Sequence, residues 1–215
     1  MASKANPPPV IPDCSVEDRI VRQLRNSRPF DNPEQEALAS LPAQAARRLF
    51  AVPLVPAAVL VGIVERSMGH ALILTIRSSG LRDHPGQISF PGGRLSELDA
   101  GPTAAALRET HEELGIHPND VRVVGYLRPQ AVVSGFVIMP VVGFLRKNAR
   151  IHPDPLEVAD VIELPLSFLE DPQNESSSVR LVRGVELPLV EYNYLSYRIW
   201  GATAAILQSL ANEIR

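Results

Sequence analysis

The sequence has only one cysteine, Cys14, in 215 residues. An intramolecular disulfide is therefore excluded, and a reducing compartment is the simplest expectation. The first nine residues lack the apolar core of a secretory signal. Two apolar stretches, 52–64 and 131–145, contain Pro and Gly and are too short to span a bilayer. We therefore expect buried strands there, no membrane association and a cytoplasmic location.

An excess of positive charge is also absent. Lys and Arg number 21 against 24 Asp and Glu, which gives a formal net charge of −3. A protein that grips nucleic acid through its phosphates usually carries a basic excess, so an extended nucleic-acid surface is not expected. A small anionic substrate stays compatible with this charge, because a few arginines or a metal ion can hold it.

Proline and residue pattern divide the chain. Residues 1–12 are rich in proline and predict a flexible tail. Residues 13–50 predict an N-terminal helical extension: one helix capped by Asp13 or Ser15 that ends near residue 27, and a second from Pro33 to about residue 50. Pro42 is expected to kink or break the second helix. We assign residues 51–215 to the main domain.

Strands and helices are expected to alternate in this domain. Val, Ile and Leu enrichment predicts strands at 57–65, 71–77, 88–90, 121–127, Phe136–Leu145, 157–164, 179–182 and 187–192, and a loop tip at 176–178. Helical patterns are expected at Pro102–Leu114, 165–170 and 199–214. Strands around a central helix, with helices at both ends, predict an α/β (α+β) layered fold.

The central helix carries the most informative residues. Glu109, Glu112 and Glu113 stand at positions i, i+3 and i+4, so one helical face presents three carboxylates. They repel one another and lie at the helix end where the dipole disfavours anions. Arg108 can pair with Glu112 and relieves part of this repulsion. A solvated acidic face is one interpretation; the other is a site for Mg²⁺ or Mn²⁺, which prefer clustered oxygen ligands.

A glycine pair precedes this helix in Phe90-Pro91-Gly92-Gly93-Arg94. Two glycines let a backbone turn sharply and expose a carbonyl to a ligand, although an ordinary turn between strand and loop has the same composition. A phosphate-binding P-loop is excluded, because no Gly-Lys-Ser/Thr follows.

Together these residues resemble the Nudix box, G-x(5)-E-x(7)-R-E-U-x-E-E-x-G-U, in which U is aliphatic. Gly93, the pair Arg108-Glu109, the pair Glu112-Glu113 and Gly115-Ile116 match it. Three features depart from it: Asp99 replaces the first glutamate, one extra residue precedes Arg108, and Thr110 replaces an aliphatic residue. The resemblance implies the Nudix fold, in which a mixed β-sheet lies between helices.

A second motif overlaps the first. Residues 74–78, 81–82, 86–87 and 90–93 look like the motif that marks the coenzyme A (CoA) pyrophosphatase branch of this family, and residues 197–203 are similar to the start of its C-terminal helix. That branch also tends to carry the extra residue. The resemblance implies metal-dependent hydrolysis of CoA or acyl-CoA to 3′,5′-ADP and 4′-phosphopantetheine or its acyl form. It also implies a homodimer, with the N-terminal helices as candidate interface elements.

The resemblance further implies roles for individual residues. The metal ligands are Glu109, Glu112 and Glu113, with the Gly93 carbonyl as a fourth. Arg108 orients the glutamates, while Arg77, Arg82, Gly92 and Gly93 contact the substrate phosphates. The general base is either a box glutamate or the later Glu157.

Several alternatives stay open at this level. Arg77 and Arg82 are equally typical of surface ion pairs, and Glu157 of an exposed strand edge. The substrate can instead be ADP-ribose or another nucleoside diphosphate derivative. A non-catalytic Nudix-like binding module is the alternative from a different class, but such modules usually lose box glutamates, and this chain retains all three.

Overall fold

A mixed sheet of eight strands forms the centre of this computed structural model, which describes residues 15–80 and 84–215. β1 and β7 run parallel at its centre, paired from Val55↔Phe136 to Val64↔Leu145, and all other pairings in the sheet are antiparallel. The path β3-β2-β1-β7-β5 is extended by β8 on β2, β4 on β1 and β6 on β7. The strands are β1 Val55–Arg66, β2 Gly69–Arg77, β3 Ile88–Ser89, β4 Gly92–Arg94, β5 Val121–Tyr126, β6 Gln130–Val132, β7 Phe136–Leu145 and β8 Val158–Pro165.

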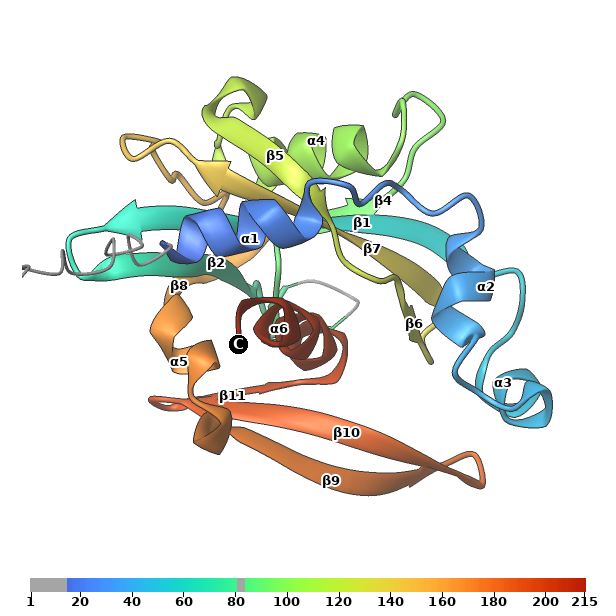
Figure 1. Cartoon of the computed structure of the whole chain (residues 1–215). Coiled ribbons are helices and arrows are strands. Elements are labelled where there is room, and N and C mark those ends of the chain that lie inside the picture. Colours follow the sequence, from blue (N-terminus) through green and yellow to red (C-terminus); the bar gives the residue numbers. More distant parts are fainter. Residues whose placement is uncertain (1–14, 81–83) are drawn as a thin grey trace, which may run out of the picture.

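Helices cover both faces of this sheet, as Figure 1 shows. The helix α4 (Pro102–Leu114) packs on one face, and α6 (Gly201–Ile214), α1 (Val16–Leu24) and α5 (Leu166–Glu170) pack on the other. Because both faces are covered, β1 reads as a continuous apolar run rather than as an alternating one. The expected layered α+β fold with a mixed sheet between helices is confirmed. No helix within the described ranges is long and apolar enough to cross a membrane.

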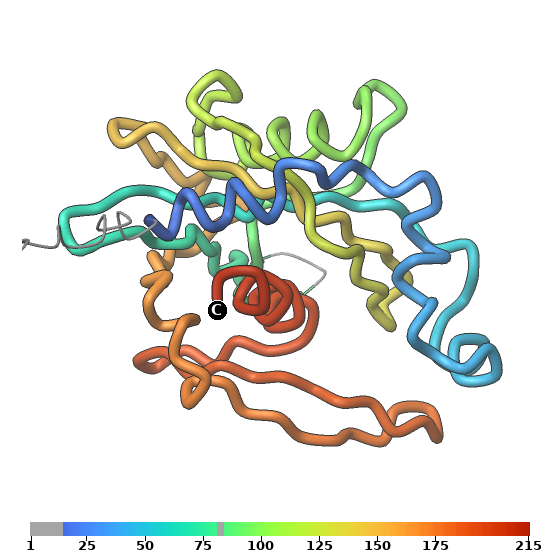
Figure 2. Tube along the Cα trace, in the orientation of Figure 1, coloured from blue at the N-terminus to red at the C-terminus, as the bar shows by residue number. Residues whose placement is uncertain are grey.

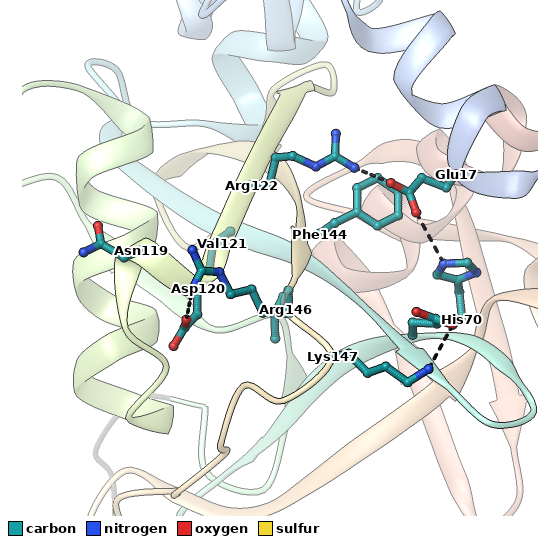
Figure 3. Close-up of a pocket in the computed structure, with 11 residues that line it drawn as sticks. Glu17, His70, Asn119, Asp120, Val121, Arg122, Phe144, Arg146 and Lys147 are labelled. Atoms are coloured by element: carbon teal, nitrogen blue, oxygen red, sulfur yellow. Dashed lines mark hydrogen bonds and ion pairs between the residues drawn. The ribbon is translucent and has the colours of Figure 1, made fainter.

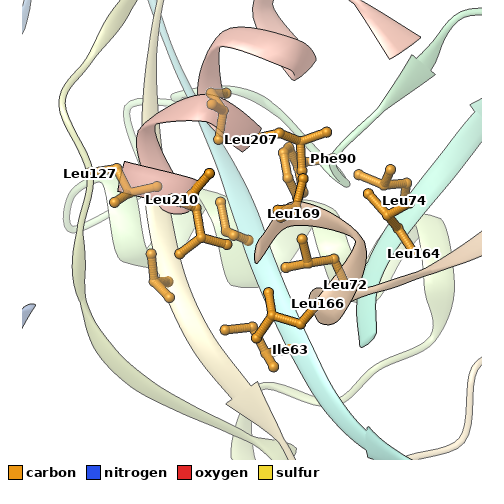
Figure 4. Packing of buried hydrophobic residues seen from close by; sticks show 14 of the residues in the cluster. Ile63, Leu72, Leu74, Phe90, Leu127, Leu164, Leu166, Leu169, Leu207 and Leu210 are labelled. Carbon is orange, nitrogen blue, oxygen red and sulfur yellow. The ribbon is translucent and has the colours of Figure 1, made fainter. Parts of the chain in front are cut away.

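Alternation along β1 separates the two layers of the core. Val59, Val61 and Ile63 join the cluster that contains α6, whereas Ala58 and Leu60 join the cluster that contains α4. Successive side chains of a strand point to opposite faces, so the register of β1 against β7 determines which residues meet α4. Figure 4 shows the α6 layer, where Leu207 and Leu210 lie among leucines from β2, α5 and β8.

A second, three-stranded antiparallel sheet lies beyond α6 (Figures 1 and 2). Its order is β11-β10-β9, with β9 Glu175–Val182, β10 Val185–Tyr194 and β11 Tyr197–Trp200. The expected loop tip at 176–178 is wrong, because these serines pair with β10; the turn lies at Arg183 and Gly184, which both have positive φ. The expected helix over 199–214 begins only at Gly201, since 197–200 form β11.

The N-terminal helices are α1, α2 (Pro33–Leu38) and α3 (Ala43–Leu49). Ser15 caps α1 by accepting from the Asp18 amide, and Asn32 caps α2 by accepting from the Gln35 amide. The expected break at Pro42 is confirmed, because α2 and α3 are separate helices and Pro42 precedes α3. The tail 1–12, Asp13 and Cys14 lie outside the described residues.

The remaining sequence expectations differ from the structure mainly at short strands. The helix at Pro102–Leu114 and the strand at Phe136–Leu145 are confirmed at both ends. The strands β4 and β6 were not expected, because three residues are too few for a visible period. Their pairing with β1 and β7 comes from those long neighbours rather than from their own propensity.

A close approach of β5 to α1 provides a test of this packing. A Cβ atom on Gly125 would lie 2.4 Å from Ser27 Oγ and 2.6 Å from the Leu24 carbonyl oxygen. We expect Gly125→Ala to lower the free energy of unfolding by about 1–3 kcal/mol, because α1 must shift. Urea denaturation measures this change. Gly80→Ala is the control, since a Cβ there meets only Ser78 Oγ at 3.9 Å; equal losses in both variants would contradict the packing argument.

Candidate active site

The end of α4 faces the sheet where β4 joins it. Pro102 occupies the first turn, where its missing N–H costs no hydrogen bond, and Gly115 ends the helix in the left-handed conformation at φ 65°. Ala105, Ala106 and Leu114 are fully buried against β1 and β7. The polar side chains at the end of the helix therefore lie at the margin of this apolar contact.

The glycine pair forms strand β4, which corrects the expected sharp turn. Gly92 and Gly93 pair with Val59 and Ala58 of β1. Gly92 has φ 152°, and a Cβ there would lie 2.3 Å from the Ala58 carbonyl oxygen. A Cβ on Gly93 would lie 2.4–2.5 Å from the carboxylate atoms of Glu109. Gly92 thus allows β4 to pair closely with β1, and Gly93 allows Glu109 at the acidic end of α4 to approach β4.

Glu113 is the most buried carboxyl group of this cluster, with a side chain only 5% exposed. It accepts a hydrogen bond from the Gly92 amide, and Arg77 Nη1 lies 4.0 Å from its Oε1. Its Oε2 is buried and has no hydrogen-bond partner among the described residues. Burial raises the pKa of Glu113 to about 8, a rise that Glu157 and Glu109 increase and that Arg77 and Gly92 oppose.

Glu109 and Glu157 complete the acidic group on this side of the helix. Burial raises the pKa of Glu109, Arg108 lowers it, and the charges of Glu112 and Glu157 raise it further. Glu157 reaches the cluster because its carbonyl oxygen accepts from the Ser78 amide at 2.8 Å, which fixes this loop beside the end of β2. The carboxylates therefore come from helix α4 and from a loop more than forty residues later.

Arg108 joins this cluster to the loop before the helix. Its Nε and Nη2 donate to Oδ1 and Oδ2 of Asp99 at 3.0 and 2.9 Å, while its Nη1 donates to Glu109 Oε1 at 2.9 Å and Glu112 Oε2 at 3.1 Å. The guanidinium lowers the pKa of Asp99 to about 2. The sequence showed Asp99 only as a departure from the box; the structure adds that its carboxylate forms a two-point contact with Arg108.

The structure does not gather every candidate residue equally. Glu112 is half exposed and contacts Arg108 rather than β4. Arg77 points to Glu113 from the end of β2, and its Nε is buried without a hydrogen-bond partner among the described residues. Arg82 lies outside the described residues.

The donor atoms of this cluster fit a hard divalent cation. Within residues 15–80 and 84–215, no three acidic, histidine or cysteine side chains already stand arranged around one point as ligands. However, the buried Oε2 of Glu113 has no hydrogen-bond partner among the described residues, and the charge of Glu157 raises the pKa of both Glu109 and Glu113. Oxygen-only ligands suit Mg²⁺ or Mn²⁺, and a cation would supply the positive charge that the described residues only partly provide.

A separate cavity of about 360 Å³ lies at the opposite end of β1, between α1 and the starts of β2 and β5. Figure 3 shows that its charged side chains face one another: Glu17 pairs with Arg122, and His70 Nε2 lies 3.9 Å from Glu17. Lys147 and Arg146 pair with Glu65 and Asp120. The ion pair of Glu17 with Arg122 links α1 to β5 of the central sheet. The charges that line this cavity are paired with each other and lie apart from the acidic cluster of α4.

A family model and curated relatives of this chain point to one family. The model of the NUDIX domain matches residues 54–181. A protein of Enterobacter sp. (strain 638) named "Uncharacterized Nudix hydrolase NudL" is 40% identical over 167 residues, covering 74% of this chain and 82% of that protein. Its counterpart of the same name in Citrobacter koseri is 41% identical with the same coverage. Among solved structures, a MutT/nudix family protein from Enterococcus faecalis covers 85% of this chain and 73% of its own at 12% identity and a TM-score of 0.47.

The raised pKa of Glu113 gives a pH test. Its folded pKa of about 8 exceeds the ordinary 4.5, so the folded protein binds the extra proton, and stability falls as pH rises between these values. Without metal, the free energy of unfolding of the wild type should fall as pH rises from about 5 to about 8. We expect this fall to be smaller in Glu113→Gln by roughly 1–3 kcal/mol, because glutamine does not titrate. Urea denaturation in EDTA at several pH values gives the free energy of unfolding of both proteins as a function of pH. Parallel slopes would show that Glu113 does not titrate in this range.

Proposed function

The chain belongs to the Nudix hydrolase family, and from this premise we propose that it cleaves the diphosphate bond of CoA or an acyl-CoA. One observation carries the proposal: Arg77 and Gly92, which belong to the motif resembling the CoA branch, both contact Glu113 of the Nudix box. The proposed phosphate contacts, Arg77 and Gly92, therefore lie beside a proposed metal ligand, Glu113. The products are 3′,5′-ADP and 4′-phosphopantetheine, or its acyl form.

Glu109, Glu112 and Glu113 are the proposed metal ligands, with the Gly93 carbonyl as a fourth. When bound, Mg²⁺ or Mn²⁺ neutralises diphosphate charge and lowers the pKa of a coordinated water. Glu109 and Glu113 are already held beside β4, and Glu112 contacts Arg108 at 3.1 Å. Arg108 therefore acts as a positioning residue, because its contact with Asp99 fixes the guanidinium that Glu109 and Glu112 share.

Arg77, Arg82 and the Gly92–Gly93 backbone are the proposed contacts to the substrate phosphates. The fork of an arginine matches phosphate oxygens, and the buried Nε of Arg77 still lacks a partner among the described residues. Glu157 is the proposed general base. It lies near Glu109 and Glu113 but belongs to a different element, so it can accept a proton from the attacking water while the box glutamates hold the metal. A cytoplasmic location and a homodimeric state stay predictions from the sequence.

The substrate proposal is tested by product analysis. We expect the protein with Mg²⁺ to convert CoA and acyl-CoA into 3′,5′-ADP and the phosphopantetheine product, and EDTA to abolish turnover. Mass spectrometry identifies the products across CoA, an acyl-CoA, ADP-ribose and a dinucleoside polyphosphate. Cleavage of ADP-ribose alone would refute the CoA proposal while leaving the Nudix reaction intact.

Two substitutions separate the proposed metal ligand from the proposed base. We expect Glu113→Gln to raise the Mg²⁺ concentration for half-maximal activity roughly 10-fold or more, because a ligand charge is lost. We expect Glu157→Gln to lower kcat by about 100-fold with little change in that concentration, because only proton transfer is lost. Initial rates measured over a range of Mg²⁺ concentrations give both parameters. Glu186→Gln, on the exposed face of β10, is the matched control and should leave both unchanged. An unchanged kcat in Glu157→Gln would contradict this assignment and leave a glutamate of the Nudix box as the general base.

A further inference from the structure

The segment that joins β7 to β8 closes the carboxyl end of α4. The last carbonyl groups of a helix have no partner within the helix itself. In α4, the Leu114 carbonyl accepts from the His152 amide at 2.8 Å. The Glu113 carbonyl accepts from the Asp154 amide at 2.9 Å. The backbone of Glu113 thus holds this segment, while its side chain belongs to the acidic cluster.

Asp154 folds this segment into a tight turn. Its Oδ1 accepts from the Leu156 amide at 2.9 Å. Its carbonyl oxygen accepts from the amides of Glu157 and Val158 at 3.0 and 2.8 Å. An aspartate that accepts from the amide two residues later forms an Asx turn, in which the side chain takes the place of a backbone acceptor. Three consecutive amides, from Leu156 to Val158, are therefore bonded to Asp154.

A β-bulge at the start of β8 turns the same part of the chain towards α4. The pairing of β8 with β2 skips Ala159, which lies between the paired residues Val158 and Asp160. Val158 and Val161 both pack in the α4 layer of the core. Residues three apart in a regular strand point to opposite faces, so the extra residue accounts for their shared side. Bulges of this kind re-aim side chains next to active sites.

The turn and the bulge meet at Glu157. Its amide donates to the Asp154 carbonyl, and its own carbonyl accepts from the Ser78 amide at the end of β2. The charge of Glu157 raises the pKa of both Glu109 and Glu113, as expected of a carboxylate that faces the acidic cluster. Because both backbone groups of Glu157 are bonded, the turn at Asp154 sets the direction in which its side chain leaves the chain.

We propose that Asp154 is a positioning residue, which holds Glu157 where it can accept a proton from the attacking water. The proposal rests on the proposed function of Glu157 as general base. A displacement of about 1 Å at a reacting group can cost roughly 100-fold in rate, so the turn has a direct effect on catalysis. Since Oδ1 of Asp154 accepts the Leu156 amide, this role requires a hydrogen-bond acceptor rather than a negative charge.

Two substitutions at this position separate the acceptor from the charge. We expect Asp154→Ala to lower kcat roughly 10-fold with little change in the Mg²⁺ requirement, because Glu157 loses its fixed place. Asp154→Asn retains an acceptor oxygen and should stay close to the wild type. Initial rates over a range of Mg²⁺ concentrations measure both, with CoA or with the compound of the product panel that is cleaved. Full kcat in Asp154→Ala, or equal losses in both variants, would overturn the proposal.

Asp171 provides the matched control. Its Oδ1 accepts from the Gln173 amide at 2.9 Å in a similar turn, but this turn lies between α5 and β9. We expect Asp171→Ala to leave kcat unchanged. A loss as large as that of Asp154→Ala would mean that any broken Asx turn slows the enzyme, and the specific role of Asp154 would be refuted.

A double variant tests whether Asp154 acts through Glu157. If it does, Asp154→Ala combined with Glu157→Gln should be no slower than Glu157→Gln alone, which is expected to lose about 100-fold. Independent effects would multiply to about 1,000-fold and would contradict the proposal. A slow Asp154→Ala beside a fully active Glu157→Gln would contradict it as well.

Hydrogen exchange tests the turn without any substrate. In Asp154→Ala we expect the amides of Leu156 and Glu157 to exchange faster, by NMR, than in the wild type or in Asp154→Asn, because their acceptor is lost or displaced. Circular dichroism reports whether each variant is folded. Unchanged exchange would overturn the positioning role even where CoA is cleaved. Failure of the proposed function would instead appear as a wild type without Mg²⁺-dependent turnover.

Discussion

The contact between the end of α4 and the two glycines of β4 is the constraint on which the site depends. Side chains at Gly92 or Gly93 would overlap β1 or the carboxylate of Glu109. The absence of a side chain at Gly92 lets β4 pair with β1, and its absence at Gly93 lets Glu109 of α4 approach β4, so Glu113 is buried beside Arg77. Burial then raises the pKa of Glu113, and one of its oxygens has no hydrogen-bond partner in the part of the chain that the structure describes. The lack of side chains at Gly92 and Gly93 therefore allows carboxyl groups to gather in a place where a positive charge would stabilise them.

Opposing charges keep this acidic cluster in place without neutralising it. Arg108 bonds to Asp99, Glu109 and Glu112 at once, so one guanidinium joins the loop before α4 to the end of the helix. A shorter aspartate at position 99 can still make a two-point contact with Arg108. Arg77, by contrast, lies 4.0 Å from Glu113 and does not saturate it. A buried acid of this kind lowers stability near neutral pH, a common cost of a site that binds a charged ligand.

The acidic cluster and the second sheet lie on opposite faces of the central sheet. α4 and the acidic cluster belong to one face, whereas α6, β9, β10 and β11 belong to the other. Tyr192 and Ile199 are buried under α6 and fix the second sheet there.

The sequence alone determined the features that depend on local order. The period of residues 102–114 and the flanking Pro and Gly predicted α4 to both ends, and the spacing of Glu109, Glu112 and Glu113 predicted a shared helical face. Apolar runs predicted β1 and β7, and the combined motifs identified the family. These signals are local because helix period, capping and strand propensity act between residues close in the chain.

Only the tertiary structure decided which residues meet. Glu157 reaches Glu109 and Glu113 through the pairing of β2 with β8, and the burial of Glu113 follows from the pairing of β4 with β1. The serines at 176–178 have loop-like composition but form a strand, because ten-residue β10 provides their hydrogen bonds. Each of these outcomes depends on contacts between residues distant in sequence, whose energy exceeds the local preferences that a sequence displays.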